Sequence, residues 1–388
     1  MSTLKVDAIV DKDSGNTTTI NGTTIGPNLS INSHNTQGKN LIINGNMRVA
    51  QRGTGPVPDG GYHTVDRWRN ANSTNEFAFT QAQVTDVPSG QGYSNSFKFT
   101  VTTPETTLDG SNYVSIYHAI EAQDLQTLCY GTSSAKTTTL SFWVKSSITG
   151  TYAVSIFGND ASRHIVPTYT ISSANTWEKK IIQIPGDTVG TINNDNGHGW
   201  QFYWLLGSGS TYTSGSGANS AWAAYANGNF AKGHTTDWAE NNGATFFLTG
   251  VQLELGDAAT EFEHESYGQT LSKCQRYFFQ ESTNADNIGG KLGVASGSGT
   301  VVVSQSMPVQ MRAKPSVSLT NANIRIGDTV SQGFSTSSGT IAINSYSGSA
   351  SVTYVYGGFT GLTSYRTYLV EPRTSDGSIG IIQFYAEL

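Results

Sequence analysis

The stretch that decides the fold is Asn40-Leu41-Ile42-Ile43-Asn44-Gly45-Asn46-Met47-Arg48-Val49-Ala50-Gln51-Arg52-Gly53-Thr54. Far along the chain it is matched by Leu248-Thr249-Gly250-Val251-Gln252-Leu253-Glu254-Leu255-Gly256. Both stretches are rich in β-branched and other apolar residues, which suit extended strands. We therefore predict an opening strand and a closing strand that lie near each other at the two ends of one β-sandwich.

The region between these stretches has the rhythm of such a sandwich. Apolar and polar residues alternate with period two in many short segments, separated by polar turns, as in a jelly roll. Clear examples are 96–101, 113–118, 139–145, 152–157 and 201–206. We predict an all-β fold, with a jelly-roll β-sandwich over residues 39–265.

The flanking regions predict three further parts. Residues 1–38 read as short strands with tight turns, including the hairpin signal Asn21-Gly22 between Thr17–Ile20 and Thr23–Ile25. One copy buries too little apolar surface to be stable alone, so we expect an intertwined homotrimeric stem for virion attachment, with a flexible tail as the alternative. Apolar spacing in 266–280 predicts a short linking helix. Residues 281–388 predict a small C-terminal β-sandwich, so that the whole is an elongated homotrimer.

The composition excludes several function classes. Only 13% of residues are charged and the net charge is −6, against about 25% charged in average globular domains. The sequence contains no cluster of Lys and Arg, which argues against a nucleic-acid partner. It also contains no apolar run long enough to insert in a membrane, and we expect no secretory signal. The two cysteines, Cys129 and Cys274, have apolar neighbours, so we expect buried free thiols rather than a disulfide.

Several motifs resemble known virion proteins. The two stretches quoted above, with Val65-Asp66-Arg67-Trp68 and Thr260-Glu261-Phe262-Glu263, resemble the jelly-roll modules of bacteriophage tail-fibre and other receptor-binding tail proteins. The opening residues 2–9 and the segment 273–278 are similar to marine phage tail-fibre-like proteins. The resemblance covers most of the first 280 residues and the last hundred only weakly. It implies a protein that is made in the host cytoplasm and resides in the phage tail.

No enzyme signature is present in the sequence. The chain lacks a phosphate-binding loop, a dinucleotide fingerprint, a His-Glu-x-x-His zinc motif and paired Cys-x-x-Cys motifs. Carboxylate pairs for glycoside hydrolysis are conceivable from Glu254 with Glu261 or Glu263, or from Asp187 with Asp195. The long solenoid repeats of glycan-cleaving tailspikes are missing. We therefore predict a protein that is not an enzyme.

A group of aromatic residues between 200 and 238 suggests carbohydrate binding, because sugar rings stack on aromatic faces and amides or carboxylates bind their hydroxyl groups. The run containing Trp200, Tyr203 and Trp204 has the pattern of core residues. In the long loop, packing at a trimer interface competes with ligand contact. The candidate glycan-binding residues are Trp222, Tyr225, Trp238, Asp237 and Asn227, and in the C-terminal region Phe359 and Asp376.

A structural metal ion is implied by the resemblance alone. Carbohydrate-binding jelly rolls often hold Ca²⁺ where the first and last strands meet, with backbone oxygens and a carboxylate as ligands. On that basis the carboxylate here is Glu254, with Asp66 as the next candidate. For Asp66 we favour a different role, an internal ion pair with Arg67 beside a core Trp68.

These observations predict a homotrimeric tail fibre that adheres to host surface polysaccharide, such as lipopolysaccharide or capsule. Many weak contacts multiplied over several chains would give firm attachment without catalysis. The N-terminus would bind other phage tail proteins. The alternatives are a purely structural tail component, such as a collar, nozzle or fibre adaptor without host contact, and a glycan-degrading tailspike.

Overall fold

The structure is a computed structural model, and it is almost entirely β. It describes residues 18–20, 23–25, 38–58, 60–73, 77–105, 108–217, 219–283, 291–320, 323–328, 334–337, 341–346, 351–373 and 380–388. The chain divides into two units, residues 1–39 and 40–388. In the first unit β1 (Thr18–Ile20) pairs with β2 (Thr23–Ile25) in antiparallel fashion, which confirms the two predicted strands. The trimeric stem and the other predicted domain boundaries stay predictions.

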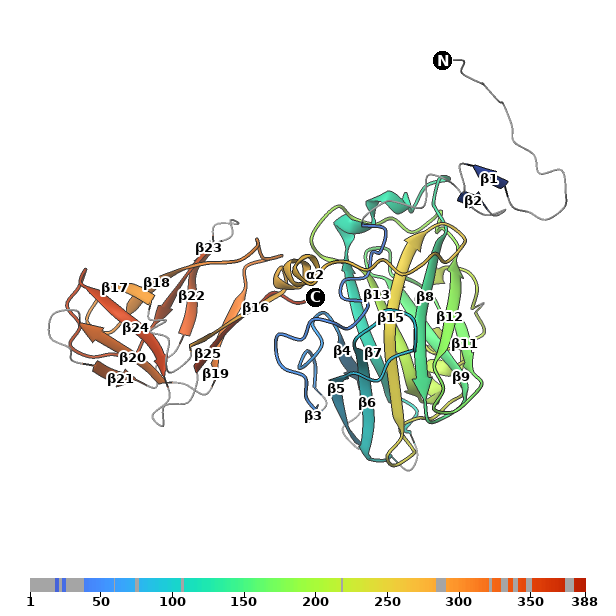
Figure 1. Cartoon of the computed structure of the whole chain (residues 1–388), viewed down its shortest axis with the longest axis horizontal. Helices are drawn as coiled ribbons and strands as arrows, with labels where there is room; N and C mark the ends of the chain where they lie inside the picture. Colours follow the sequence, from blue (N-terminus) through green and yellow to red (C-terminus); the bar gives the residue numbers. More distant parts are fainter. Residues whose placement is uncertain are drawn as a thin grey trace, which may run out of the picture. The chain divides into compact units, whose positions relative to one another are not determined.

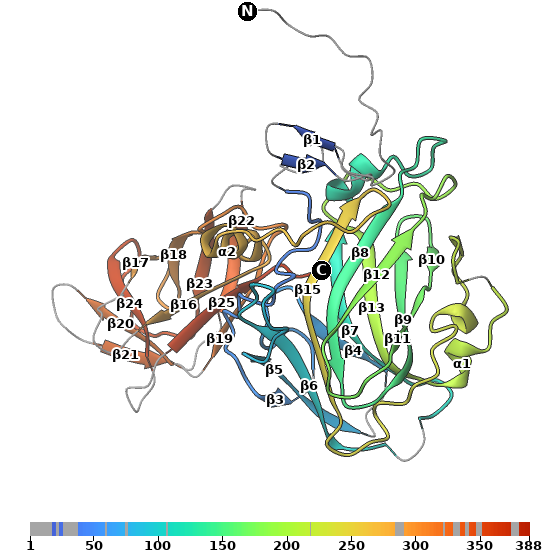
Figure 2. The ribbon, with the colours of Figure 1, turned by 45° about the vertical axis from the view of Figure 1, so that its right-hand side comes forward.

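The N-terminal part of the second unit is a sandwich of two sheets (Figure 1 and Figure 2). Every described strand pair in it is antiparallel. The first sheet has the order β12-β8-β15-β6-β5-β3, and the second has the order β14-β10-β9-β13-β7-β4 with β11 beside β9. The strands of the first sheet are β3 (Val57–Pro58), β5 (Ala78–Val84), β6 (Ser96–Thr103), β8 (Thr138–Ser146), β12 (Glu178–Ile184) and β15 (Thr245–Leu255). Those of the second are β4 (Arg69–Asn72), β7 (Tyr113–Glu121), β9 (Gly150–Gly158), β10 (Arg163–Ile165), β11 (Thr168–Ile171), β13 (His198–Ser208) and β14 (Ala223–Ala224).

The core lies between these sheets, and strand alternation fills it. On β13, Trp200, Phe202 and Trp204 are at most 1% exposed and belong to one apolar cluster, while Gln201 and Tyr203 between them are partly exposed. Successive side chains of a strand point to opposite faces, so one face of β13 supplies the core and the other looks outward. The 3₁₀-helix η1 (Ala122–Leu128) follows β7 directly.

The opening stretch 40–54 is not the extended strand that we predicted. It forms turns, because Asn44 and Met47 both have φ of 57°. Asn tolerates this left-handed conformation, and its amide can bond to nearby backbone groups. Here the Asn44 side chain accepts from Val49 N and donates to the carbonyl oxygens of Val49 and Asp66, which fixes the turn.

The opening stretch nevertheless lies against the closing strand, as expected. Leu41 N donates to Leu253 O and Val251 N donates to Gly45 O, both at 2.9 Å. The second bond exists because β15 bulges between Thr249 and Gln252, which releases Val251 from its ladder with β8. A Cβ atom on Gly45 would lie 2.0 Å from Val251 O, so only glycine fits this approach.

Replacing Gly45 by Ala should therefore destabilise the sandwich by about 1–3 kcal/mol or more, because backbone atoms cannot move away cheaply. The measurement is the free energy of unfolding in denaturant. The matched control is Gly268→Ala on helix α2 (Tyr267–Gln275), where an added Cβ meets no atom within 4 Å. Equal stability of the two variants would contradict the close approach at Gly45.

The C-terminal part begins with α2, whose N-cap Ser266 forms a capping box with Gln269. The helix ends earlier than predicted, at Gln275, because Phe278 already pairs with Tyr385 in a sheet. The two C-terminal sheets have the orders β16-β25-β19 and β21-β20-β24-β17-β18-β23-β22, and their buried side chains form one core. The strands are β16 (Phe278–Thr283), β17 (Lys291–Ala295), β18 (Val301–Ser306), β19 (Ser316–Thr320), β20 (Asn323–Asp328), β21 (Phe334–Ser337), β22 (Ile341–Tyr346), β23 (Ser351–Tyr356), β24 (Thr367–Arg373) and β25 (Gly380–Tyr385). An all-β second sandwich is what the sequence predicts.

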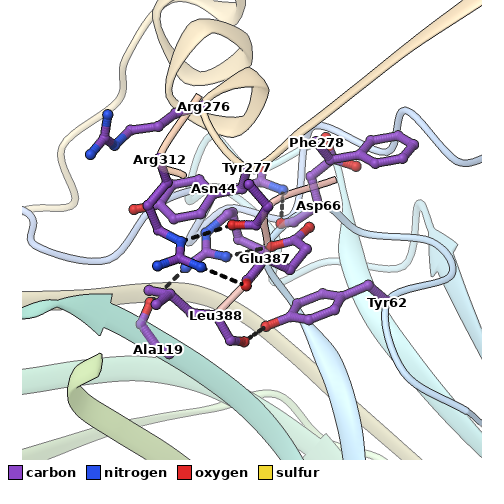
Figure 3. Close-up of polar contacts among 12 residues, drawn as sticks. Asn44, Tyr62, Asp66, Ala119, Arg276, Tyr277, Phe278, Arg312, Glu387 and Leu388 are labelled. Carbon is purple, nitrogen blue, oxygen red and sulfur yellow. Dashed lines mark hydrogen bonds and ion pairs between the residues drawn. The ribbon is translucent and has the colours of Figure 1, made fainter. Parts of the chain in front are cut away.

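The last residues of the chain, Glu387 and Leu388, are bonded to the first sandwich (Figure 3), and the buried Arg67 makes one of these bonds. Arg67 is 0% exposed; its guanidinium donates to Glu387 at 2.5 Å and to Ala119 O at 2.8 Å, and lies 3.5 Å from the centre of the Tyr277 ring. Arg52 binds the other oxygen of Glu387. We call Arg52, Arg67, Tyr277 and Glu387 the Arg67 cluster. The expected Asp66–Arg67 pair is wrong, because the carboxylate that reaches Arg67 comes from Glu387.

Further contacts surround the Arg67 cluster. Tyr62 donates to Leu388 O at 2.6 Å, and Arg312 donates to the carbonyl oxygens of Ala386, Glu387 and Asn196. The Arg276 guanidinium binds both oxygens of Glu121 at 2.7 Å, a bidentate geometry that is stronger than a single contact. These bonds hold the last residues and the start of the C-terminal part on the sandwich.

Replacing Glu387 by Gln should cost about 3–5 kcal/mol of stability, because it leaves the buried Arg67 charge without its anion. Chemical unfolding measures the loss. The control is Glu265→Gln, which breaks the more exposed pair with Lys273 and should cost less than about 1 kcal/mol. Similar losses in both variants would show that Arg67 does not depend on Glu387.

Candidate functional site

Two of the predicted glycan-binding aromatics are core residues, which corrects the prediction. Trp238 is 0% exposed and its ring meets that of Phe79 inside the sandwich, at 6.2 Å between centroids. A hydrogen bond from Trp238 N to Leu206 O fixes its backbone at the end of β13. Phe359 is 5% exposed and belongs to the C-terminal core. Neither ring presents a face to a ligand.

Trp222 is partly exposed, but its ring is used in packing. The indole Nε1 donates to Pro185 O at 2.8 Å, and the ring lies 5.3 Å from that of Trp200 and 5.8 Å from that of Tyr130. Its backbone carbonyl accepts from Arg163, which also binds Asp187 with two nitrogens. Trp222 therefore covers one end of the sandwich core.

Tyr225 is a predicted aromatic residue that is exposed in the structure. Its side chain is 38% exposed, and its ring lies 5.2 Å from both Phe157 and His164. The backbone places it there, since β14 pairs with β10 and Tyr225 N donates to Ser162 O. Tyr225 thus lies over the outward side of the second sheet.

That outward side carries a second group of aromatic rings besides Tyr225 and Phe157. Tyr203 on β13 lies opposite Tyr117 on β7, with the two rings 5.1 Å apart, and Gln201 lies opposite Phe157 on β9. Phe230 lies 5.1 Å from both Tyr203 and Tyr113, and Tyr212 lies 5.4 Å from Tyr113. The partly or fully exposed members define what we call the outer aromatic face: Tyr113, Phe157, Tyr203, Tyr212 and Tyr225, with the amides Asn159 and Gln201.

Polar groups run through this face. The Tyr203 hydroxyl donates to Gln201 Oε1 at 2.5 Å, and Gln201 Nε2 donates to Asn159 Oδ1 at 3.2 Å. Burial raises the pKa of Tyr203 and of Tyr225, and neighbouring tyrosines raise both further. The hydroxyls therefore stay protonated at neutral pH and can donate hydrogen bonds. Rings beside amides and hydroxyls can bind a flat, hydroxylated ligand through stacking and through hydrogen bonds between uncharged groups.

Sequence reasoning missed most of this face. It assigned Tyr203 to the core run with Trp200 and Trp204, and it passed over Tyr113, Phe157 and Gln201. A signal was present: Gln201 and Tyr203 alternate with Trp200, Phe202 and Trp204, so they must lie on the opposite side of the strand. The alternation does not show that the side of the strand with Gln201 and Tyr203 stays partly exposed to solvent.

The other two predicted polar residues of this region follow Tyr225 in the chain. Asn227 is exposed at the start of η2 (Asn227–Asn229), and Asp237 lies after it in the connection to β15. No hydrogen bond between described residues joins either side chain to Tyr225. Burial and then Glu240 raise the pKa of Asp237 to about 6. Asp376 lies outside the described residues.

The two candidate metal-binding carboxylates, Glu254 and Asp66, each bind other groups of the protein. Both oxygens of Glu254 accept protein hydrogen bonds, from Gln252 and from Thr260. Asp66 accepts from Gln51 and lies 3.8 Å from Arg52, near the Arg67 cluster. The described part of the chain holds no group of three His, Cys, Asp or Glu side chains that could bind a metal ion. A Ca²⁺ ion held by backbone oxygens and Glu254 stays a prediction of the resemblance.

Asp66 should make the stability of the protein depend on pH. Burial raises its pKa to about 6, and Arg52 and Gln51 oppose this only in part. In the unfolded chain the pKa of an aspartic acid is about 3.9. Between about pH 3.9 and about pH 6 the folded state therefore binds more protons than the unfolded state, and the stability of the protein falls as the pH rises. When the pH falls from roughly 7.5 to 4.5, the free energy of unfolding of the wild type should therefore rise by about 2 kcal/mol relative to that of Asp66→Asn.

Unfolding free energies of both proteins at the two pH values test this. The control is Asp257→Asn at an exposed position, whose difference from the wild type should stay constant. A difference for Asp66→Asn that shrinks on acidification would mean that Arg52 lowers the pKa of Asp66 instead.

Comparison with known proteins gives only distant similarities. No protein-family model matches the chain, and no curated protein matches it. Among solved structures, the enzymatically active domain of tailspike protein 4 from bacteriophage CBA120 is similar at 13% identity and a TM-score of 0.31, over 56% of this chain and 22% of that one. A family 11 carbohydrate-binding module of a Clostridium thermocellum cellulosomal cellulase is similar at 16% identity and a TM-score of 0.27, over 55% of this chain and 98% of that one.

A further similar structure is the module TmCBM61 in complex with β-1,4-galactotriose, with 12% identity and a TM-score of 0.27 over 56% of this chain and all of that one. At these values the similarities assign no function to the chain. Within the described residues, no helix is both long and apolar enough to cross a membrane.

Proposed function

We propose that this protein binds carbohydrate on its outer aromatic face, without catalysis. The observation that carries the proposal is the bonded row Tyr203–Gln201–Asn159 beside the partly exposed rings of Phe157 and Tyr225. Sugar rings stack on such aromatic faces, and amides and hydroxyls bind sugar hydroxyl groups. The scaffold is a rigid sheet, so few side chains need to be ordered on binding.

We infer further that the protein acts as a phage tail fibre that adheres to host surface polysaccharide. The support is the sequence resemblance of the opening and closing stretches to phage tail proteins, together with the weakly charged, Gly-rich composition. A homotrimer would present three faces, and several weak contacts would combine into firm attachment. The N-terminal residues would bind other tail proteins, and the protein would reside in the virion.

Binding without hydrolysis is supported by the engagement of the candidate carboxylates. Asp187 is held by Arg163 in a two-nitrogen ion pair, and Glu254 accepts hydrogen bonds on both oxygens. Asp195 accepts from Gly197 N in a local turn. Glycoside hydrolysis needs two carboxyl groups that face a bound sugar across a gap. These carboxylates instead hold neighbouring segments in place.

Tyr225→Ala tests the proposal. The wild type is first tested against a panel of bacterial surface glycans to find the polysaccharides that it binds. The variant should bind these about tenfold more weakly, because it lacks one stacking ring. Folding should be unaffected, since Tyr225 is 38% exposed. The control is Tyr267→Ala on α2, 46% exposed and away from the face, which should bind as the wild type does. Affinities follow from surface plasmon resonance or affinity electrophoresis.

Three outcomes would count against the proposal. If no polysaccharide binds and the protein does not compete with phage for adsorption, a purely structural tail component is the better description. If both tyrosine variants bind like the wild type, the outer aromatic face is not the site. Release of reducing ends from a bound glycan would show a glycan-degrading tailspike.

A further inference from the structure

A cation lies at one side of the outer aromatic face. Arg69 on β4 is in register with Tyr117 on β7, which is in register with Tyr203 on β13, so the three residues form one row across the sheet. Adjacent strands are about 4.8 Å apart, so Arg69 lies about 10 Å from Tyr203 along the row. A sugar next to one stacked on Tyr203 would reach it.

Aromatic rings hold the Arg69 guanidinium in place. It lies 4.0 Å from the centre of the Tyr117 ring and 5.7 Å from that of Tyr62. A guanidinium that stacks on a ring keeps its N–H groups in the ring-parallel plane, where they can bind a carboxylate or phosphate with two hydrogen bonds. One N–H group donates to Asn70 O at 3.1 Å. An arginine has five N–H donors, so donors remain for a ligand.

No carboxylate neutralises Arg69 in the described part of the chain. The ion pairs there use the two neighbouring arginines instead, since Glu387 binds Arg52 and Arg67. Arg69 is partly exposed, whereas Arg67 is fully buried. Arg69 is thus a preoriented cation on a protein whose net charge is −6.

From this row we propose that the outer aromatic face binds an acidic polysaccharide, and that Arg69 binds its anionic substituent, such as the carboxylate of a uronic acid. This rests on the proposed function and names the class of glycan. Neutral sugar rings stack on Tyr203 and Tyr225, and the anionic group of an adjacent residue accepts from Arg69. Specificity arises because the reduced, uncharged substituent has no negative charge to pair with Arg69 and no second oxygen to accept a bidentate pair of hydrogen bonds.

The test uses the glycan panel in two forms, native and carboxyl-reduced, in which each uronic acid carboxylate has become a neutral alcohol. The wild type should bind at least one native acidic polysaccharide about tenfold or more tighter than its reduced form. Arg69→Gln should lose this preference and bind both forms like the wild type binds the reduced one. Arg69→Lys keeps the charge without the planar fork and should retain only part of the preference.

The matched control is Lys179→Gln on β12, which removes one exposed positive charge from the other sheet and should leave the preference intact. Equal binding of native and reduced forms by the wild type, or an unchanged preference in Arg69→Gln, would overturn the role of Arg69 while the proposed function stands. A preference lost equally in Lys179→Gln would show a general charge effect and overturn it too. Absence of binding to every member in either form would overturn the proposed function itself.

Discussion

The structure of residues 40–388 depends on one buried charge. The Arg67 guanidinium is fully removed from water, and it is tolerable there only because Glu387, Ala119 O and the Tyr277 ring surround it. These partners come from the last residues of the chain, from β7 and from the end of α2. Because the charge needs all of them, it ties the C-terminal sheets to the first sandwich, and the chain from Asn40 onward forms one unit.

The same contact limits the outer aromatic face. Leu388 and Tyr277 pack on the outward side of the second sheet, in one apolar cluster with Tyr117 and Ala119. At the other end Phe230 and Ala231 cover Leu205 and Ala153. Between these covers Tyr203, Gln201 and Phe157 stay partly exposed. The outer aromatic face is therefore the part of the sheet surface that these two segments leave uncovered. Its size is set by how they pack on the sheet.

Sequence patterns predicted secondary structure that depends on neighbouring residues. They failed where a contact with a residue far along the chain decides the position of a side chain. Alternation predicted many of the strands, and the apolar spacing in 266–280 predicted a helix where α2 lies. The turn of Asn44 was missed, because isolated apolar residues there resemble a strand. Trp238 was read as a loop residue because nothing local shows that it meets Phe79. The pairing of Arg67 with Glu387, far apart in sequence, needs the folded chain.

The placement of Tyr225 bears on how such a protein can change over generations. Its segment is attached to the scaffold through the two-residue strand β14, the bond to Ser162 O and the packing of Trp222, whereas Phe157 beneath it belongs to the long strand β9. New residues at the tip of this connection can therefore change the exposed surface while the sheet keeps its register. Such a protein can diversify here without rebuilding its framework, much as antibodies vary loops on a constant sandwich.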